Sequence, residues 1–110
     1  MRQTKEVKLI VDVLEDHKAE DVEVVDVKER TPFADFYILA TAPSAKALVG
    51  YPDDIEEALT KAKFEIRKVE GTLESEWVVV DCGAVVVQIF TEKKRQEIGL
   101  DELLNRKLGR

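Results

Sequence analysis

Apolar residues recur along the chain with two periods, one typical of helices and the other of strands. Near the N-terminus they follow the i, i+3, i+4, i+7 spacing of one helical face, in the order Val7, Ile10, Val11 and Leu14. This spacing predicts a helix that is capped by Thr4 and runs to about Asp16. At the other end, a charged stretch at 92–97 leads into a predicted last helix that contains Leu100, Leu103, Leu104 and Leu108.

The middle of the chain has a helical pattern that two residues interrupt. Gly50 and Pro52 fall inside it, and a proline in a helix interior costs about 3 kcal/mol. At the first position of a helix the same proline costs little. We therefore expect a short helical turn at 45–49 and a separate helix from Pro52 to about Lys63.

Short runs rich in β-branched and aromatic residues predict five strands. They lie at residues 22–27, 35–40, 64–69, 77–81 and 85–90. Gly83 supplies a flexible turn position, so the last two strands are predicted to form a hairpin. The near-continuous valines of this hairpin indicate that both faces of the sheet are covered there.

The predicted order is α-β-β-α-β-β-β-α. It indicates an α/β (α+β) chain with a mixed five-stranded sheet and helices packed on it. A helical connection between the second and third strands favours a parallel pair, whereas the short connections favour antiparallel pairs. A length of 110 residues suits one domain, which we expect to span residues 1–110.

The net charge of −6 narrows the choice of partner. A protein that reads a nucleic-acid backbone is usually basic, so we expect little direct contact with nucleic acid. If the protein acts on a ribosome, its acidic surface should meet a basic ribosomal protein. The alternative is an acidic surface that only keeps the protein in solution. The sequence has neither a secretory leader nor an apolar stretch of about 18 residues, so we expect a cytoplasmic protein without membrane contact.

Residues suited to catalysis or metal binding are few. Cys82 is the single cysteine and His17 the single histidine, which excludes an intrachain disulfide and a zinc-binding Cys/His set. A Cys–His dyad is compatible with the spacing, but a small apolar Cys82 in a hairpin turn is the favoured interpretation. Asp26, Asp35 and Asp81 lie in or beside strands, yet no Asp-x-Asp pair that would hold magnesium is present on a strand. We expect no enzyme, no metal and no cofactor.

The segment 41–44 follows a predicted strand and opens a predicted helix. Backbone N–H groups at such a place can bind an anion. The segment lacks the glycines that let a phosphate approach closely, so a helix N-cap by Ser44 is favoured.

Trp77 is the residue whose type most strongly indicates an interaction, because tryptophan is enriched at interface anchors. In a strand, alternation puts Trp77, Val79 and Asp81 on one face. A tryptophan in the hydrophobic core is the alternative. The charged stretch at 92–97 is either a solvated surface or, through Arg95, a contact site.

A series of short strings carries a family resemblance. They are Asp-Phe-Tyr-Ile-Leu-Ala-Thr at 35–41, Val-Glu-Gly at 69–71, Trp-Val-Val-Val-Asp-Cys-Gly at 77–83 and Val-Val-Val-Gln-Ile-Phe at 85–90, followed by Arg95. In this order and at these separations the chain resembles the RsfS/Iojap family of ribosomal silencing factors, over about residues 7–104.

The resemblance implies a protein that binds the large ribosomal subunit through large-subunit protein fourteen. Such a protein blocks subunit joining sterically and represses translation, with a fold related to nucleotidyltransferases but without their catalysis. Carried over by position, Trp77 would be the buried anchor, Asp81 and Glu70 would face Lys or Arg of the ribosomal protein, and Arg95 would make a polar contact nearby. Asp35 and Tyr37 also match family positions, where a structural role is favoured.

The chain departs from the family pattern at several places, which include the segment 42–46, Gly50, Pro52 and Cys82, and five further residues. The five are Ala84, Gln88, Glu97, Ile98 and Leu104, where the family commonly has Asp, His, an aromatic pair and Trp. If those family residues are anchors, this chain binds its partner differently or less tightly. An alternative function is a non-catalytic dimerising domain of the same fold with a different partner, and a nucleotidyltransferase-type enzyme is a third. A homodimer is compatible with the sequence, although no residue pattern points to it.

Overall fold

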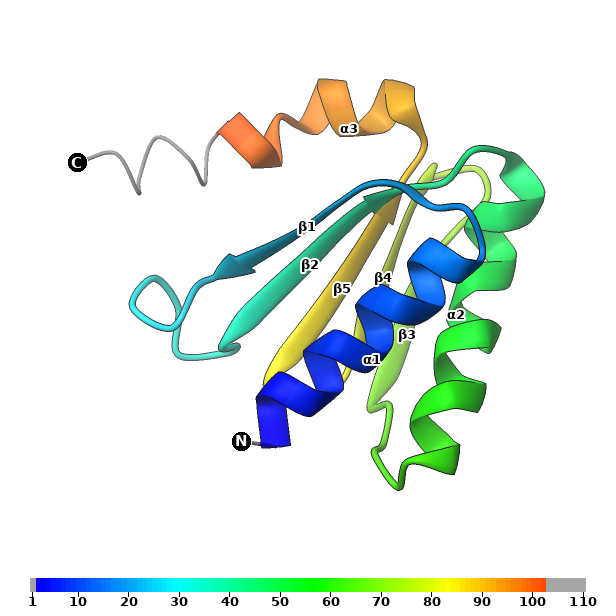
Figure 1. The fold of residues 1–110 in the computed structure, drawn as a ribbon. Helices are drawn as coiled ribbons and strands as arrows, with labels where there is room; N and C mark the ends of the chain where they lie inside the picture. Colours follow the sequence, from blue (N-terminus) through cyan, green and yellow to red (C-terminus); the bar gives the residue numbers. More distant parts are fainter. Residues whose placement is uncertain (1, 103–110) are drawn as a thin grey trace.

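The computed structural model describes the backbone of residues 2–102 and the side chains of residues 5–102. Its helices and strands alternate in the predicted order (Figure 1). The helices are α1 (Arg2–Asp16), α2 (Ala45–Lys61) and α3 (Glu92–Ile98). The strands are β1 (Glu20–Asp26), β2 (Phe36–Thr41), β3 (Lys68–Thr72), β4 (Trp77–Asp81) and β5 (Val85–Phe90). None of the helices within this part of the chain is long and apolar enough to span a bilayer.

The strands form one mixed five-stranded sheet in the order β1-β2-β5-β4-β3. This confirms the predicted fold class. The pair β2–β5 is parallel, and the other three pairs are antiparallel. The predicted parallel pairing of the second and third strands is wrong: β2 and β3 run in the same direction, but β5 and β4 lie between them. β5 is almost wholly buried whereas every residue of β3 is exposed, so β5 is the strand that suits the interior position beside β2.

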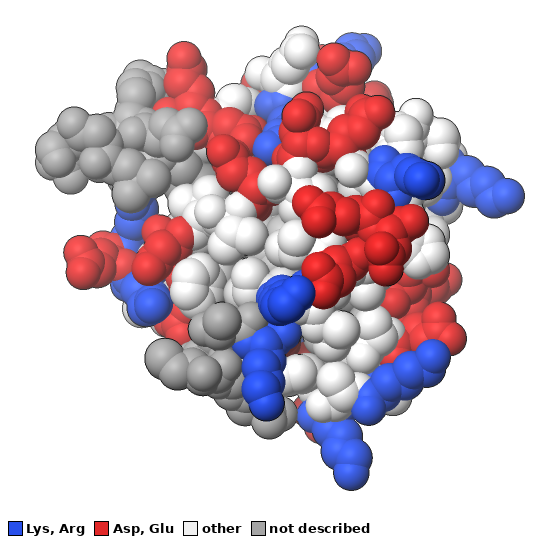
Figure 2. Space-filling model, in the orientation of Figure 1, with Lys and Arg blue, Asp and Glu red and all other residues white. Residues whose placement is uncertain are grey.

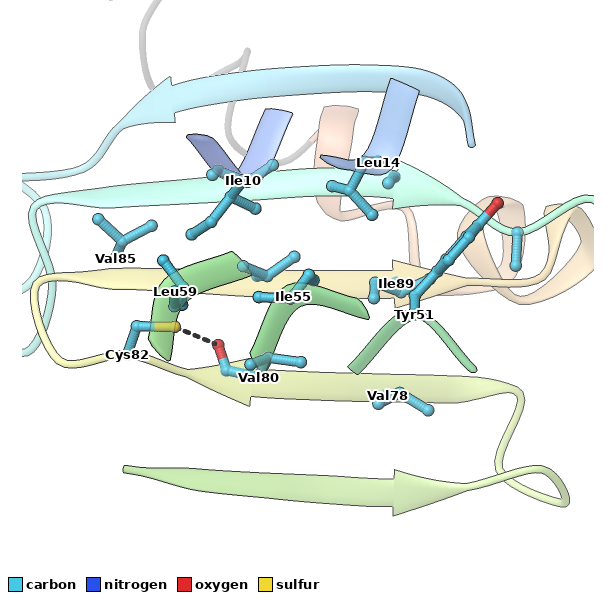
Figure 3. Packing of buried hydrophobic residues seen from close by; sticks show 14 of the residues in the cluster. Ile10, Leu14, Tyr51, Ile55, Leu59, Val78, Val80, Cys82, Val85 and Ile89 are labelled. Carbon is cyan, nitrogen blue, oxygen red and sulfur yellow. Dashed lines mark hydrogen bonds between the residues drawn. The ribbon is translucent and has the colours of Figure 1, made fainter. Parts of the chain in front are cut away.

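Helices α1 and α2 lie side by side on one face of the sheet (Figure 1). Their apolar stripes, which include Ile10, Leu14, Ile55 and Leu59, meet the inward-facing residues of the strands (Figure 3). On the strands these inward positions alternate, as the period of two requires. The core residues on this face of β2, β4 and β5 are Ile38, Ala40, Val78, Val80, Val85, Val87 and Ile89.

The predicted break in the second helix is wrong. α2 is one helix that passes through Gly50 and Pro52. Four of its side chains are at most 2% exposed, namely Leu48, Tyr51, Ile55 and Leu59. Burying a large apolar side chain contributes about 1.5–3 kcal/mol, so four of them outweigh the roughly 3 kcal/mol that an interior proline costs. The predicted N-cap is confirmed: Ser44 Oγ accepts a hydrogen bond from the N–H of Ala47 at 3.1 Å.

The third strand lies later than predicted, at Lys68–Thr72 instead of 64–69. Phe64 and Ile66 are not part of a strand. They lie in an irregular segment, and their side chains pack against the hydrophobic core. Gly71 has a φ of 102°, and a side chain there would collide with the Trp77 carbonyl oxygen of the neighbouring strand. Only glycine fits that close approach, so the strand continues through a position that the sequence pattern assigns to a loop.

The chain ends also differ from expectation. α1 begins at Arg2, so Thr4 lies inside the helix and does not cap it. The charged stretch is not a lead-in but is itself α3, which ends where Gly99 takes the left-handed conformation with a φ of 66°. Residues 100–102 are helical again, in agreement with the last helix predicted at Leu100. The other residues predicted for that helix, Leu103, Leu104 and Leu108, lie outside the described part of the chain.

Candidate functional site

The face of the sheet opposite α1 and α2 is only partly covered, and we call it the open face. Neighbouring strands place residues on it in rows, one row joining Glu70, Val79, Gln88 and Leu39 and the next joining Lys68, Asp81, Val86 and Tyr37. On this side, the prediction that both sheet faces are covered at the hairpin is confirmed for Gln88 and Phe90 of β5, which are buried, but is wrong for β4. Val79 and Val86 are only half-buried, because α1 and α2 lie on the other face.

Beside these rows the open face has a small core of its own. It consists of Val25, Val27, Ala34, Leu39 and Phe90, with Tyr37, Trp77, Val86 and Leu100 packed around it. Leu100, which follows α3, covers part of this cluster. The β4 and β5 half of the face keeps half-buried apolar side chains next to solvent, which is the character of a surface that another protein can cover.

Trp77 lies at the edge of the small core. Its ring stacks on Phe90, with centroids 5.5 Å apart and planes at 20°. Its indole Nε1–H donates a hydrogen bond to Gln88 Oε1 at 3.1 Å. Phe90 and Gln88 are buried, whereas Trp77 is half-buried. The side chain is thus neither a full core residue nor a free surface residue, and its orientation is fixed by two neighbours.

The two acidic residues predicted for partner contact share this face with Trp77. Asp81 ends β4 and is half-buried, and its Oδ1 accepts a hydrogen bond from the N–H of Gly83 at 2.8 Å. Gly83 has a φ of 89°, which fits the flexible turn position predicted for it. Glu70 is exposed and forms an ion pair with Lys68 at 3.1 Å. Sequence alternation and strand pairing therefore bring Trp77, Asp81 and Glu70 onto one surface.

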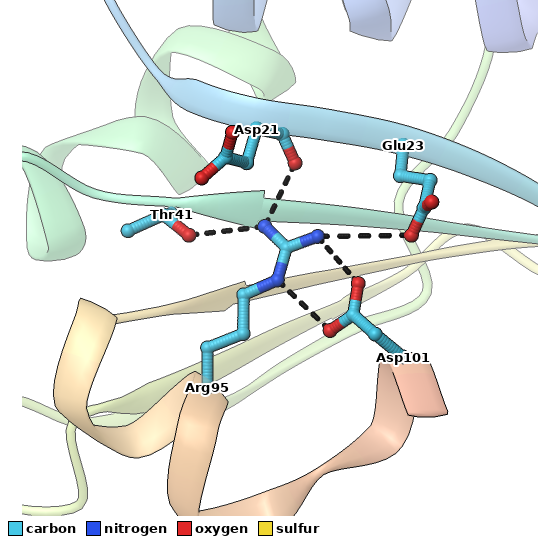
Figure 4. A network of polar contacts seen from close by, with 5 residues as sticks. All are labelled: Asp21, Glu23, Thr41, Arg95 and Asp101. Atoms are coloured by element: carbon cyan, nitrogen blue, oxygen red, sulfur yellow. Dashed lines mark hydrogen bonds and ion pairs between the residues drawn. The ribbon is translucent and has the colours of Figure 1, made fainter. Parts of the chain in front are cut away.

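Arg95 has a different environment from these three residues. Its guanidinium donates two hydrogen bonds to the Asp101 carboxylate, at 2.9 and 2.7 Å, and two more to the Asp21 carbonyl and Thr41 Oγ1 (Figure 4). Glu23 lies 3.8 Å away, and the Arg95 side chain is only 12% exposed. Arg95 thus ties α3 to β1 and β2, and the partner contact predicted for it remains a prediction.

The ionisation of this cluster follows from the same contacts. The hydrogen bonds from Arg95 lower the pKa of Asp101, and the Asp101 carboxylate in turn raises the pKa of Arg95. A hydrogen bond with Asp101, together with burial, raises the pKa of Glu23. The guanidinium therefore holds two acidic groups together at the end of the sheet.

The other family positions have mostly structural surroundings. The backbone of Asp35 accepts a hydrogen bond from the Val27 N–H and donates one to the Ala84 carbonyl, at 2.9 and 2.7 Å. Ala84 acts there through its backbone, so its side chain is not needed for this contact. On α3, Glu97 pairs with Lys94 at 3.0 Å and Ile98 is exposed.

Cys82 and His17, the two residues of the possible dyad, lie in different parts of the fold. Burial raises the pKa of the Cys82 thiol to about 12, helped by the negative charges of Glu6 and Asp81. His17 lies elsewhere, at the end of α1, with its Nδ1 3.6 Å from an Asp54 oxygen. Among the residues that the structure describes, no group of three or more His, Cys, Asp or Glu side chains is arranged to hold a metal ion.

Comparison with known proteins assigns this chain to a protein family. Residues 1–108 match the family model described as "RsfS: Ribosomal silencing factor during starvation". The chain belongs to the RsfS family. Among curated members, "Ribosomal silencing factor RsfS" of Treponema pallidum is 35% identical over 98 residues, which cover 86% of this chain and 85% of the relative. The protein of the same name from Halalkalibacterium halodurans is 30% identical over 95 residues, covering 86% and 81%.

A solved structure supports the assignment to the RsfS family. The crystal structure of a Chromobacterium violaceum protein superposes with a TM-score of 0.88 at 30% identity, covering 96% of this chain and 88% of that one. The mixed sheet and its helices are therefore a shared RsfS architecture.

The sequence did not indicate the two residues that hold Trp77 on the open face. Gln88 was noted as a departure from the family pattern, not as the hydrogen-bond partner of Trp77, and Phe90 was not considered. The available signal was the hairpin register. Once Gly83 is placed at the turn, Trp77 stands opposite Phe90 and Gln88 is its neighbour on the same face.

Proposed function

We propose that this RsfS-family chain is a ribosomal silencing factor that binds the large ribosomal subunit through large-subunit protein fourteen. On this proposal it blocks the joining of the small subunit and represses translation in the cytoplasm. Family membership supports the proposal, since the family description and the names of the curated relatives refer to ribosomal silencing. The proposed action is steric, so it requires no catalysis and no cofactor.

The observation that carries the proposal is the setting of Trp77 on the open face. Stacking on Phe90 and the hydrogen bond to Gln88 hold the ring in one orientation before any partner arrives. A pre-oriented aromatic side chain loses little conformational entropy on binding, which favours it as an anchor. Half-buried Val79 and Val86 extend the apolar surface beside it.

The acidic side chains beside this surface favour a basic partner. Asp81 and Glu70 lie on the same face as Trp77, and the whole chain has a net charge of −6. Carboxylates at the rim of an apolar contact speed association with a positively charged protein and exclude acidic ones. They also oppose binding to bare ribosomal RNA, whose phosphates repel them. A basic ribosomal protein is the partner that fits both properties.

The test is co-sedimentation of the purified protein with isolated large and small ribosomal subunits, followed by measurement of subunit joining on sucrose gradients. We expect binding to the large subunit alone and fewer joined ribosomes. A matched pair of variants locates the contact. Val79→Glu puts a charge on the open face, and Val69→Glu puts one on the neighbouring strand but on the other face.

We expect Val79→Glu to lose large-subunit binding and Val69→Glu to keep it, with both proteins folded by circular dichroism. Equal binding by both variants would place the contact elsewhere on the chain. If the unchanged protein binds neither subunit but its mass rises with concentration, the alternative of a dimerising domain with another partner is favoured.

A further inference from the structure

A groove runs between α1 and α2, on the side of the molecule opposite the open face. Its floor is apolar and comes from both helices, with Leu9 and Val13 on α1 and Ala58 and Ala62 at the end of α2. Leu9, Val13 and Ala58 are only half-buried, and Ala62 is exposed. The two helices pack against each other beneath these residues, so the floor is fixed by the core and not by a loop.

The rim of the groove is acidic. Asp16, Asp54 and Glu57 line it, against a single permanent positive charge, Lys61. Lys61 reaches Glu57 at 3.8 Å, and both side chains are more than two-thirds exposed, so this pair is weak. His17 also lines the groove, with its Nδ1 3.6 Å from an Asp54 oxygen, and offsets that carboxylate only when it is protonated. The rim thus keeps an excess of negative charge. Figure 2, seen from the side of α1 and α2, shows acidic side chains gathered on this face.

We propose that this groove is a second docking site, which accepts a basic amphipathic helix of a protein partner. An apolar floor between two helices suits the apolar stripe of a third helix, and the carboxylates suit Lys or Arg on its flanks. Nucleic acid and anionic lipid are disfavoured because their phosphates would face Asp16, Asp54 and Glu57. Since the groove and the open face lie on opposite sides of the sheet, both sites can be filled at once.

The test uses the full chain, labelled with ¹⁵N, and a synthetic helical peptide of about 16 residues with leucines on one face and lysines on the other. We expect amide shifts to concentrate in the groove, at Leu9, Val13, Ala58 and Ala62. A peptide of the same composition, reordered so that its leucines no longer share a face, should bind at least about tenfold more weakly. Equal binding by the reordered peptide would overturn the proposal.

Two double variants of equal charge separate docking from general attraction. Asp54→Lys with Glu57→Lys reverses two charges of the rim, while Glu29→Lys with Glu74→Lys reverses two exposed charges elsewhere. We expect the first to weaken peptide binding at least about tenfold and the second to change it less than about twofold. Equal losses would mean non-specific attraction.

Sedimentation velocity of the chain alone completes the test. A dimer that the groove variant abolishes would mean that a second copy fills the groove, which also overturns the proposal. Large-subunit binding is measured on the same proteins. If the unchanged chain does not bind the large subunit, the result counts against the proposed function. It does not count against the groove, because the peptide titration contains no ribosome.

Discussion

Trp77 and Gln88 stand on adjacent antiparallel strands, and the indole Nε1–H of the first donates to the amide Oε1 of the second at 3.1 Å. Gln88 is 7% exposed and is a polar residue in the middle of the sheet. Its amide oxygen satisfies the indole N–H at the edge of a small apolar core, so the tryptophan can lie against Phe90 without losing a hydrogen bond on burial.

Replacing Gln88 should therefore test how the tryptophan is held. Gln88→Leu leaves the half-buried indole N–H without its acceptor, and we expect the free energy of unfolding to fall by about 1–2 kcal/mol. Urea unfolding followed by the fluorescence of Trp77, the single tryptophan, measures it directly. If the variant is as stable as the original chain and its fluorescence emission is unchanged, the hydrogen bond does not contribute to the free energy of unfolding.

Trp77→Ala should separate anchoring from packing. If the ring is a contact hot spot, the variant should lose at least about 2 kcal/mol of large-subunit binding. Trp77→Phe is the control, because it keeps an aromatic ring against Phe90 while it removes the N–H and the smaller ring of the indole. A large drop in melting temperature with unchanged affinity would instead make Trp77 a core residue.

The negative charge of Asp81 can be removed without loss of the hydrogen bond that Asp81 accepts in the β4–β5 turn. Asp81→Asn keeps an oxygen that can accept from the Gly83 N–H, but removes the negative charge. We expect nearly unchanged stability and a slower association with the large subunit, with less dependence on salt concentration. Stopped-flow association at low and high salt provides the measurement. An unchanged association rate would show that the charge of Asp81 does not contribute to electrostatic attraction of the partner.

Arg95→Gln should destabilise the chain in a pH-dependent way. Arg95 lowers the pKa of Asp101 below its ordinary value of 3.8, so this contact stabilises the fold above that pH and is lost as the pH falls through the lowered pKa. The raised pKa of Glu23 acts in the opposite sense, because its charge is disfavoured in the folded chain. Without Arg95 the two carboxylates repel each other at neutral pH.

We therefore expect Arg95→Gln to cost about 2 kcal/mol at neutral pH and much less at an acidic pH below the lowered pKa of Asp101, where both carboxyl groups are protonated. Urea unfolding at the two pH values gives the comparison. Lys94→Gln, which removes the exposed pair with Glu97, serves as a control and should cost well under about 1 kcal/mol. A loss for Arg95→Gln that does not change with pH would contradict the ionic origin of its effect.

Cys82 should be nearly inert in the folded protein. A thiol with a pKa of about 12 is almost wholly protonated at neutral pH, and its side chain is buried under α2 (Figure 3). We expect iodoacetamide to modify Cys82 slowly in native buffer and rapidly in guanidinium chloride, as measured by mass spectrometry. Rapid native modification would indicate frequent local opening at the end of β4.

Local patterns predicted the hairpin well, because both of its strands and the turn glycine have strong residue preferences. β4 and β5 have the predicted bounds, 77–81 and 85–90. From those bounds alternation also placed Trp77 and Asp81 on one face, as the structure has them. The place of Asp81 beside Trp77 therefore followed from the sequence. The place of Glu70 did not, because the sequence pattern assigned it to a loop that the structure shows to be part of β3.

Two of the failures have a common physical cause, because each depends on contacts distant along the chain. Pro52 stays helical because α2 buries a stripe of side chains against the sheet, which a local rule cannot count. Arg95 is held by Asp21 and Thr41, which are 74 and 54 residues away in sequence. No local pattern in the charged stretch at 92–97 indicates such partners.

The strand order has a consequence for synthesis of the chain. β5, the last strand in the described part of the chain, occupies the centre of the sheet and joins β2 on one side to β4 on the other. A nascent chain whose residues 85–90 have not yet left the ribosome can form the pairs β1–β2 and β3–β4, but it lacks the strand that joins them. Closing the parallel pair of β2 and β5 then requires contacts across about half of the sequence, which slows folding. The sheet should thus form only after residues 85–90 have been made, and C-terminal truncations that reach β5 should fail to fold.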